Sequence, residues 1–199
     1  MVDKSIEELL SNISLTLFRK NFFGIYHGSI SAKLDYSSFV INTSDAIFDR
    51  IDSKTLCKLA TINKDYRWKV ASIEADIHAS IYNHIHEAKY VAFGMPPYTT
   101  AYAINNDVIE CVDYFGKTLY DKIPVYNPGD FNTWYQRNSL EVTKFLKESP
   151  HHIMVIKGIG VYAYDRDIHE LVKKVAILEN SCRLLSLTSG SQIAGLCVE

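Results

Sequence analysis

Residues 72–97 read SIEADIHASIYNHIHEAKYVAFGMPP and contain a strong helix signal followed by a strong strand signal. Isoleucines at every fourth position place one apolar ridge on a helix that runs from Ser72 to about Glu87. The following KYVAFG is an apolar strand, and the two prolines end it because proline has no N–H for a further ladder bond. The stretch therefore predicts a helix that leads directly into a strand.

The alternation of helix and strand signals continues on both sides, without a linker, a repeat or a low-complexity tract. Ser5 is expected to cap the first helix and Asp167 the last one. Mixed elements without regular βαβ spacing predict one domain over residues 1–199, an α/β or α+β sandwich around one sheet. The other expected helices are Ser5–Leu17, Ser53–Ala60, Trp134–Glu148 and Asp167–Leu187, and Ala101–Ile104 is expected to be a short helical or irregular piece. The other expected strands are Ser37–Asn42, Val108–Phe115 and two segments that meet near Gly158–Gly160.

The composition is that of an ordinary globular domain, with 47% hydrophobic and 22% charged residues, and this excludes intrinsic disorder. Twenty-one basic against 23 acidic residues give a net charge of −2, so neither bulk nucleic-acid binding nor membrane-surface binding is expected. No apolar run approaches a membrane span, and the N-terminus lacks the apolar core of a signal peptide. The four scattered cysteines, Cys57, Cys111, Cys182 and Cys197, are expected to be reduced thiols of a cytoplasmic protein.

Seven histidines raise the question of a metal site, and their spacing argues against one. His84 and His86 would point about 200° apart on a helix, and His151 and His152 would face opposite sides of a strand. None has the i, i+4 spacing or the cysteine partners of a zinc motif.

Two short patterns have both a functional and a purely structural interpretation. Glu74 and His78 lie one turn apart on one helix face, where the pair either positions a proton-transfer group or forms a partly buried hydrogen bond. The segment Gly28–Ser31, GSIS, either cradles an anion through backbone N–H groups or is a plain turn.

In their order along the chain, several segments resemble the class II aldolase and adducin family, and the match covers nearly the whole sequence. Gly28–Ser31 is similar to the family's G-N-x-S segment, and Val40–Asp45 is similar to its I-T-P-S/T-G turn. Ser72–Tyr82 resembles its S-S-E-x-x-x-H-x-x-I-Y helix, and Tyr90–Pro97 stands where the family has A-V-V-H-T-H-P. Ile159–Glu179 resembles the N-H-G-V-V-V-x-G stretch and the helix that follows it.

The resemblance implies a three-layer α/β/α sandwich around a mostly antiparallel mixed sheet, usually assembled as a homo-oligomer, a four-fold symmetric tetramer. Enzymes of the family bind zinc or another divalent ion through three histidines, and the ion polarises the carbonyl of a phosphorylated sugar. A glutamate acts as the acid/base, whereas adducin-type members use the fold for interaction. By this resemblance Glu74 is the acid/base candidate with His78 as its possible partner, and the expected substrate- or anion-binding residues are Gly28, Ser29, Ser44 and Ser72.

The sequence departs from the family at the metal ligands. The three histidines fall on Phe93, Met95 and Ile159. Phenyl and alkyl groups cannot coordinate a dication, and a lone thioether suits only copper(I), so no metal cofactor is predicted. The phosphate pocket is also altered, because Ser29 replaces the asparagine and Asp45 stands where the family has a glycine.

Two functions are compatible with these residues. The first is a non-catalytic or repurposed class II aldolase-like protein that works as a binding or assembly module. The alternative is a lyase or isomerase that cleaves or epimerises a small sugar or carbonyl substrate, with Glu74 as general acid/base and a non-standard electrophile. Lys157, two residues before Ile159, is a candidate for this electrophile, either as a positive charge or as a Schiff-base amine. The other interpretation is that it is a solvated strand lysine. Thirteen tyrosines suit either protein contacts or ordinary sheet positions.

Overall fold

The computed structural model describes the backbone of residues 3–194 and the side chains as far as Thr188. Six α-helices, eight strands and two short 3-10 turns make up this part of the chain. In chain order they are α1 (Lys4–Arg19), β1 (Ser29–Lys33), β2 (Ser38–Asn42), β3 (Leu56–Ala60), η1 (Tyr66–Lys69), α2 (Ala75–His84), β4 (Tyr90–Gly94), α3 (Pro97–Asn105), β5 (Val108–Glu110), α4 (Tyr114–Leu119), β6 (Lys122–Tyr126), η2 (Phe131–Thr133), α5 (Trp134–Glu148), β7 (Ile153–Ile156), β8 (Gly160–Asp165) and α6 (Ile168–Ala194).

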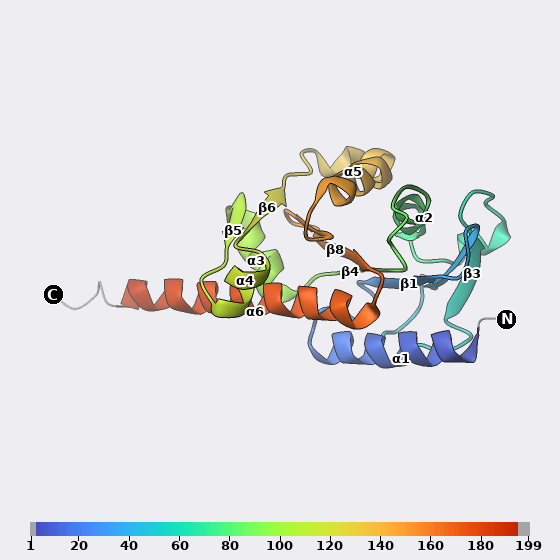
Figure 1. Ribbon diagram of the computed structural model, residues 1–199, viewed down its shortest axis with the longest axis horizontal. Helices are drawn as coiled ribbons and strands as arrows, with labels where there is room; N and C mark the ends of the chain where they lie inside the picture. The colour runs from blue at the N-terminus through green and yellow to red at the C-terminus, as the bar shows by residue number, and fades with distance from the viewer. Residues whose placement is uncertain (1–2, 195–199) are drawn as a thin grey trace.

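The eight strands form one sheet in the order β3-β2-β1-β4-β8-β7-β6-β5. Every neighbouring pair is antiparallel except β6 and β7, which run parallel. Helices α2 and α5 cover one face, and α1 and α6 lie along the other (Figure 1). The predicted three-layer sandwich around a mostly antiparallel mixed sheet is therefore confirmed.

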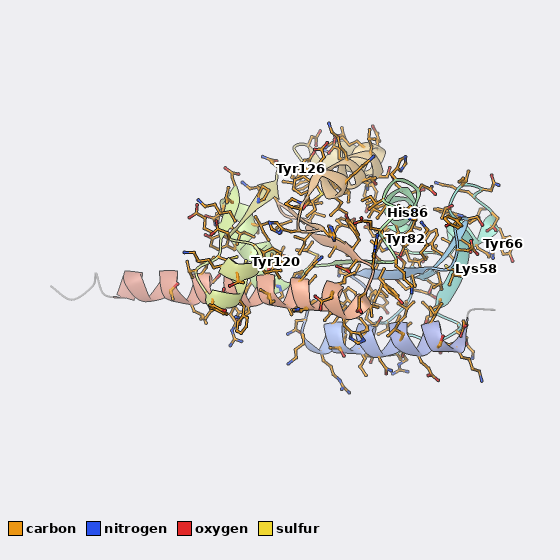
Figure 2. All side chains as sticks on the ribbon, viewed as in Figure 1. Lys58, Tyr66, Tyr82, His86, Tyr120 and Tyr126 are labelled. Atoms are coloured by element: carbon orange, nitrogen blue, oxygen red, sulfur yellow. The ribbon has the colours of Figure 1, made fainter. Side chains whose placement is uncertain are left out.

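Two apolar clusters hold the three layers together, one on each face of the sheet. Alternation along β8 shows how a strand contributes to both, because successive side chains point to opposite faces. Val161 and Ala163 belong to the cluster beneath α1 and α6, whereas Tyr162 and Tyr164 belong to the one beneath α2 and α5. Figure 2 shows the side chains that fill both layers, with Tyr82 of α2 among those labelled.

Four predictions of local structure were wrong or incomplete. Ser53–Ala60 is not a helix: Asp52 accepts hydrogen bonds from Lys54 N and Thr55 N in a turn, and the strand β3 follows because it pairs with the buried β2. The GSIS segment is not a plain turn, since all of its residues after Gly28 lie in β1. The first helix is capped by Asp3 instead of Ser5. The strand at Val108 ends at Glu110, because Asp113 caps α4.

Other predicted elements are present, although α2 is shorter than the predicted Ser72–Glu87 and α6 extends beyond Leu187. Helix α5 has the predicted bounds, and Asp167 Oδ1 accepts a hydrogen bond from His169 N at the start of α6. Cys57, Cys111 and Cys182 are free thiols, whereas Cys197 lies outside the described residues. Within the described part of the chain, no helix is long and apolar enough to span a membrane.

Candidate functional site

A small cleft of about 110 Å³ opens where three neighbouring strands have their ends. Because β1 runs antiparallel to both β2 and β4, the start of β1 lies beside the last residues of the other two. Helix α2 begins at the same place. The cleft is lined by Tyr26, His27, Gly28, Asn42, Thr43, Ser44, Ala46, Ser72, Ile73, Glu74 and Phe93.

Glu74 is the ionisable carboxyl of this cleft and stands at the N-cap position of α2. Its backbone N–H donates to Ser72 Oγ at 3.3 Å, and the residue as a whole is 9% exposed. Burial raises the pKa of Glu74, while a hydrogen bond donated by the Tyr162 hydroxyl to Glu74 Oε2 acts in the opposite direction. Burial and the neighbouring Glu74 together raise the pKa of Tyr162 well above its ordinary value, so the phenol keeps its proton.

Tyr162 is the residue of this site that sequence reasoning missed. It is fully buried, and its ring stacks on Phe93, its register partner across β4 and β8, with 4.5 Å between ring centroids. Met95 and Ile159 pack against the same apolar cluster. The three positions at which the resemblance led us to expect histidines in the family thus lie in apolar surroundings, and a phenol contacts Glu74. The alternation of GVYAYD was the available signal, since it places Tyr162 on the same face as Tyr164.

The side chains that line this cleft include only two of the residue types that ordinarily bind zinc. A catalytic zinc site takes three protein ligands, and the cleft offers Glu74 and His27 as candidates. No group of three or more His, Cys, Asp or Glu side chains with ion-binding geometry occurs among the described residues. His78 cannot complete such a set, because serine hydroxyls engage both of its ring nitrogens.

His78 is placed differently from the predicted Glu74–His78 pair. Its Nε2 lies 2.8 Å from Ser29 Oγ and its Nδ1 lies 2.6 Å from Ser31 Oγ, and only its backbone N–H contacts Glu74, at the carbonyl oxygen. The Ser31 hydroxyl is also 2.7 Å from the Tyr82 hydroxyl. Complete burial lowers the pKa of His78 to about 3, so the ring is neutral. The side chains of Glu74 and His78 therefore do not form the predicted pair. His78 instead belongs to a buried chain of hydrogen bonds that connects α2 to β1.

The four predicted anion-binding residues are divided between the cleft and the interior. Gly28, Ser44 and Ser72 line the cleft, whereas Ser29 is fully buried and its hydroxyl contacts His78. Gly28 has a φ of +153°, and a Cβ there would lie 2.7 Å from the Phe23 ring, so glycine is required.

Lys157 lies apart from Glu74. It follows β7, and its Nζ forms an ion pair with Asp107 Oδ1 at 2.6 Å. It does not line the cleft, so the structure does not bring it to the site as an electrophile.

The comparisons with known proteins identify the class to which this fold and cleft belong. The sequence model of the Class II Aldolase and Adducin N-terminal domain matches residues 8–186, so the chain belongs to this family. No curated protein sequence matches the chain.

Solved structures agree in fold. An L-fuculose-1-phosphate aldolase from Thermus thermophilus superposes with a TM-score of 0.86 at 18% identity, covering 98% of this chain and 100% of that one. YgbL from Klebsiella pneumoniae, a putative aldolase/epimerase/decarboxylase, gives 0.76 at 17% identity, covering 94% and 91%. The N-terminal class II aldolase domain of a Thermoplasma acidophilum protein gives 0.68 at 16% identity, covering 93% and 95%.

Proposed function

We propose that this chain is a non-catalytic or repurposed class II aldolase-like protein that works as a binding or assembly module. The observation that carries the proposal is the replacement of the family's three histidines by Phe93, Met95 and Ile159, together with the hydrogen bond from Tyr162 to Glu74. A metal ion that polarises a carbonyl is worth several kcal/mol of transition-state stabilisation. Since about 1.4 kcal/mol corresponds to a factor of ten in rate, losing it removes most of the catalysis.

The state of Glu74 supports the same proposal. A general base must be ionised and free to approach the substrate. Here burial raises the pKa of the carboxyl, and one of its oxygens already accepts a hydrogen bond from a buried phenol.

Metal content and turnover test the proposal together. Protein purified without chelator is analysed for zinc and other divalent metals, then titrated with zinc by calorimetry. It is also assayed for aldol cleavage of L-fuculose 1-phosphate, the substrate named for the similar Thermus protein. We expect substoichiometric metal and no cleavage. Stoichiometric, tightly bound zinc together with cleavage would overturn the proposal.

The second candidate is a lyase or isomerase in which Glu74 is the general acid/base on a small carbonyl or sugar substrate. It is favoured by the position of Glu74 in an open cleft beside Ser72. The test is turnover over a panel of small sugar and carbonyl substrates by the wild type and Glu74→Gln. Loss of a wild-type activity in the variant would support this candidate, and equal activity would remove it.

The proposal also includes a cytoplasmic homo-oligomer, a tetramer by analogy with the family. Sedimentation is expected to return about four times the 22.7 kDa mass of one chain. A monomer at micromolar concentration would refute this part.

A further inference from the structure

A second hollow lies between the end of α1, the start of α3 and the middle of α6. It encloses about 530 Å³, which is within the range of small-molecule sites. Leu17, Phe22 and Val172 give it apolar walls, because they belong to or pack on the core cluster of this face of the sheet. None of its lining residues is shared with the cleft at Glu74, so it is a separate groove.

Three cations line this groove: Arg19, Lys20 and Arg183. Among the described residues, no carboxylate oxygen lies within ion-pair distance of any of them. The other four arginines each have a carboxylate partner, namely Arg50, Arg67, Arg137 and Arg166. The two arginines of the described chain that lack one therefore meet at a single groove.

Glu179 also lines the groove, but its oxygens are already engaged. Oε1 accepts from Tyr98 N at 3.0 Å, and Oε2 accepts from both Thr99 N and Thr99 Oγ1 at 2.8 Å. Glu179 and Arg183 have the i, i+4 spacing of a helical ion pair, yet the Arg183 guanidinium lies over the Tyr98 ring at 5.9 Å instead. The groove thus keeps a positive charge that its own acid does not neutralise.

The dipole of α1 accounts for only part of this charge. Arg19 is in the last turn of α1, where a cation compensates the partial negative charge of the helix end. Arg183 does not compensate a helix end in this way, because α6 continues to Ala194. A guanidinium that lacks a carboxylate partner and lies beside an apolar wall presents a planar fork that matches a carboxylate or a phosphate.

We propose that this groove binds a small organic anion with an apolar body. Arg183, Arg19 and Lys20 hold the phosphate or carboxylate group, and the apolar body packs against Leu17 and Phe22. The proposal does not depend on the function assigned to the Glu74 cleft.

Titration of the deuterated, ¹⁵N-labelled full chain, followed by amide shifts, tests the proposal. The probes are phenyl phosphate, phenylacetate, inorganic phosphate and the neutral benzyl alcohol. We expect saturable shifts at Phe22, Tyr98 and Arg183 with at least one aromatic anion, weaker shifts with inorganic phosphate, and none with benzyl alcohol. Comparing phenyl phosphate with phenylacetate distinguishes the two anionic groups.

Arg183→Gln is expected to weaken the tighter of the two aromatic anions by about ten-fold, because it removes one charge-assisted contact. Arg50→Gln is the matched control, since the Arg50 side chain is 82% exposed and does not line the groove. Equal affinities of the two variants, shifts confined to Gly28, Ser44 and Ser72, or no saturable binding would each overturn the proposal. If Arg183→Gln instead changes the sedimentation of the chain and no probe binds, the groove is a contact between copies and the small-molecule proposal is wrong.

Discussion

The hydrogen bond between Tyr162 and Glu74 can be removed with almost no change in shape. Tyr162→Phe deletes one hydroxyl from a fully buried ring and leaves the ring that stacks on Phe93. The carboxyl oxygen then loses its donor in a buried setting. Leaving a buried acceptor unsatisfied costs about 1–3 kcal/mol. For a chain of this length, each kcal/mol lowers Tm by roughly 2–4 °C.

The loss of stability in Tyr162→Phe should depend on pH, because the hydrogen bond from the phenol stabilises the ionised carboxylate of Glu74 more than the protonated carboxyl. Burial raises the pKa of Glu74 above its value of 4.5 in the unfolded chain, so the native state binds more protons there. This contribution to stability is present at low pH and is lost as the pH rises through the native pKa. Removing the phenol raises that pKa further. Tyr162→Phe should therefore destabilise more at about pH 8 than near pH 4.5.

Urea denaturation at both pH values measures this difference. Tyr164→Phe is the matched control, since Tyr164 is a buried residue of the same strand and points to the same face. We expect the control to lose less than about 0.5 kcal/mol, with little dependence on pH. The reasoning is refuted if the two variants lose equal stability at pH 8, or if the loss in Tyr162→Phe is the same at both pH values.

Three further substitutions probe the frame around the site, each measured by urea denaturation. His78→Gln should reduce the dependence of the free energy of unfolding on pH between about 3 and 6.5. In the wild type the unfolded chain binds a proton over this range that the buried ring does not, which gives a slope of about 1.4 kcal/mol per pH unit. An unchanged slope would contradict this. Gly160→Ala should cost about 2 kcal/mol or more, because φ is +140° and a Cβ would collide with the Gly94 carbonyl oxygen. Gly129→Ala should cost less, because φ there is also positive but a Cβ would meet only Arg137 Nη2, at an ordinary contact distance of 3.9 Å; equal losses would argue against the collision. Glu179→Gln should lower the free energy of unfolding by about 1–2 kcal/mol, because it weakens the hydrogen bonds that Glu179 accepts from the start of α3. Glu170→Gln, which removes an exposed ion pair, should change it by no more than about 0.5 kcal/mol. Similar losses in the two variants would exclude a capping role for Glu179.

Long periodic segments of the sequence were sufficient to predict most of the sheet and its covering helices. The isoleucines at every fourth position predicted α2, because that spacing places them on one face of a helix. The uninterrupted apolar run that follows predicted β4, a strand in which every residue is buried. β3 was mistaken for a helix because it is a short edge strand whose conformation is set by pairing with β2. β1 was not predicted as a strand because its serines are polar and follow a glycine, yet their hydroxyls are satisfied inside the protein by His78.

The candidate site was predictable in its outline and not in its contacts. The family pattern directed attention to Glu74 and to the apolar residues at the histidine positions. The partner of Glu74 comes from β8, 88 residues later in the chain, and no local pattern reports a contact at that separation. His78 was paired with Glu74 because helical spacing describes neighbours on one helix and says nothing about the serines of the strand opposite.

The phenol that contacts Glu74 also bears on any attempt to engineer a metal site into this cleft. Imidazoles introduced at Phe93, Met95 and Ile159 would still leave the carboxyl engaged by Tyr162. A carboxyl free to act beside such a site therefore requires a fourth change, at Tyr162, and that change is expected to cost stability because Glu74 loses its buried donor.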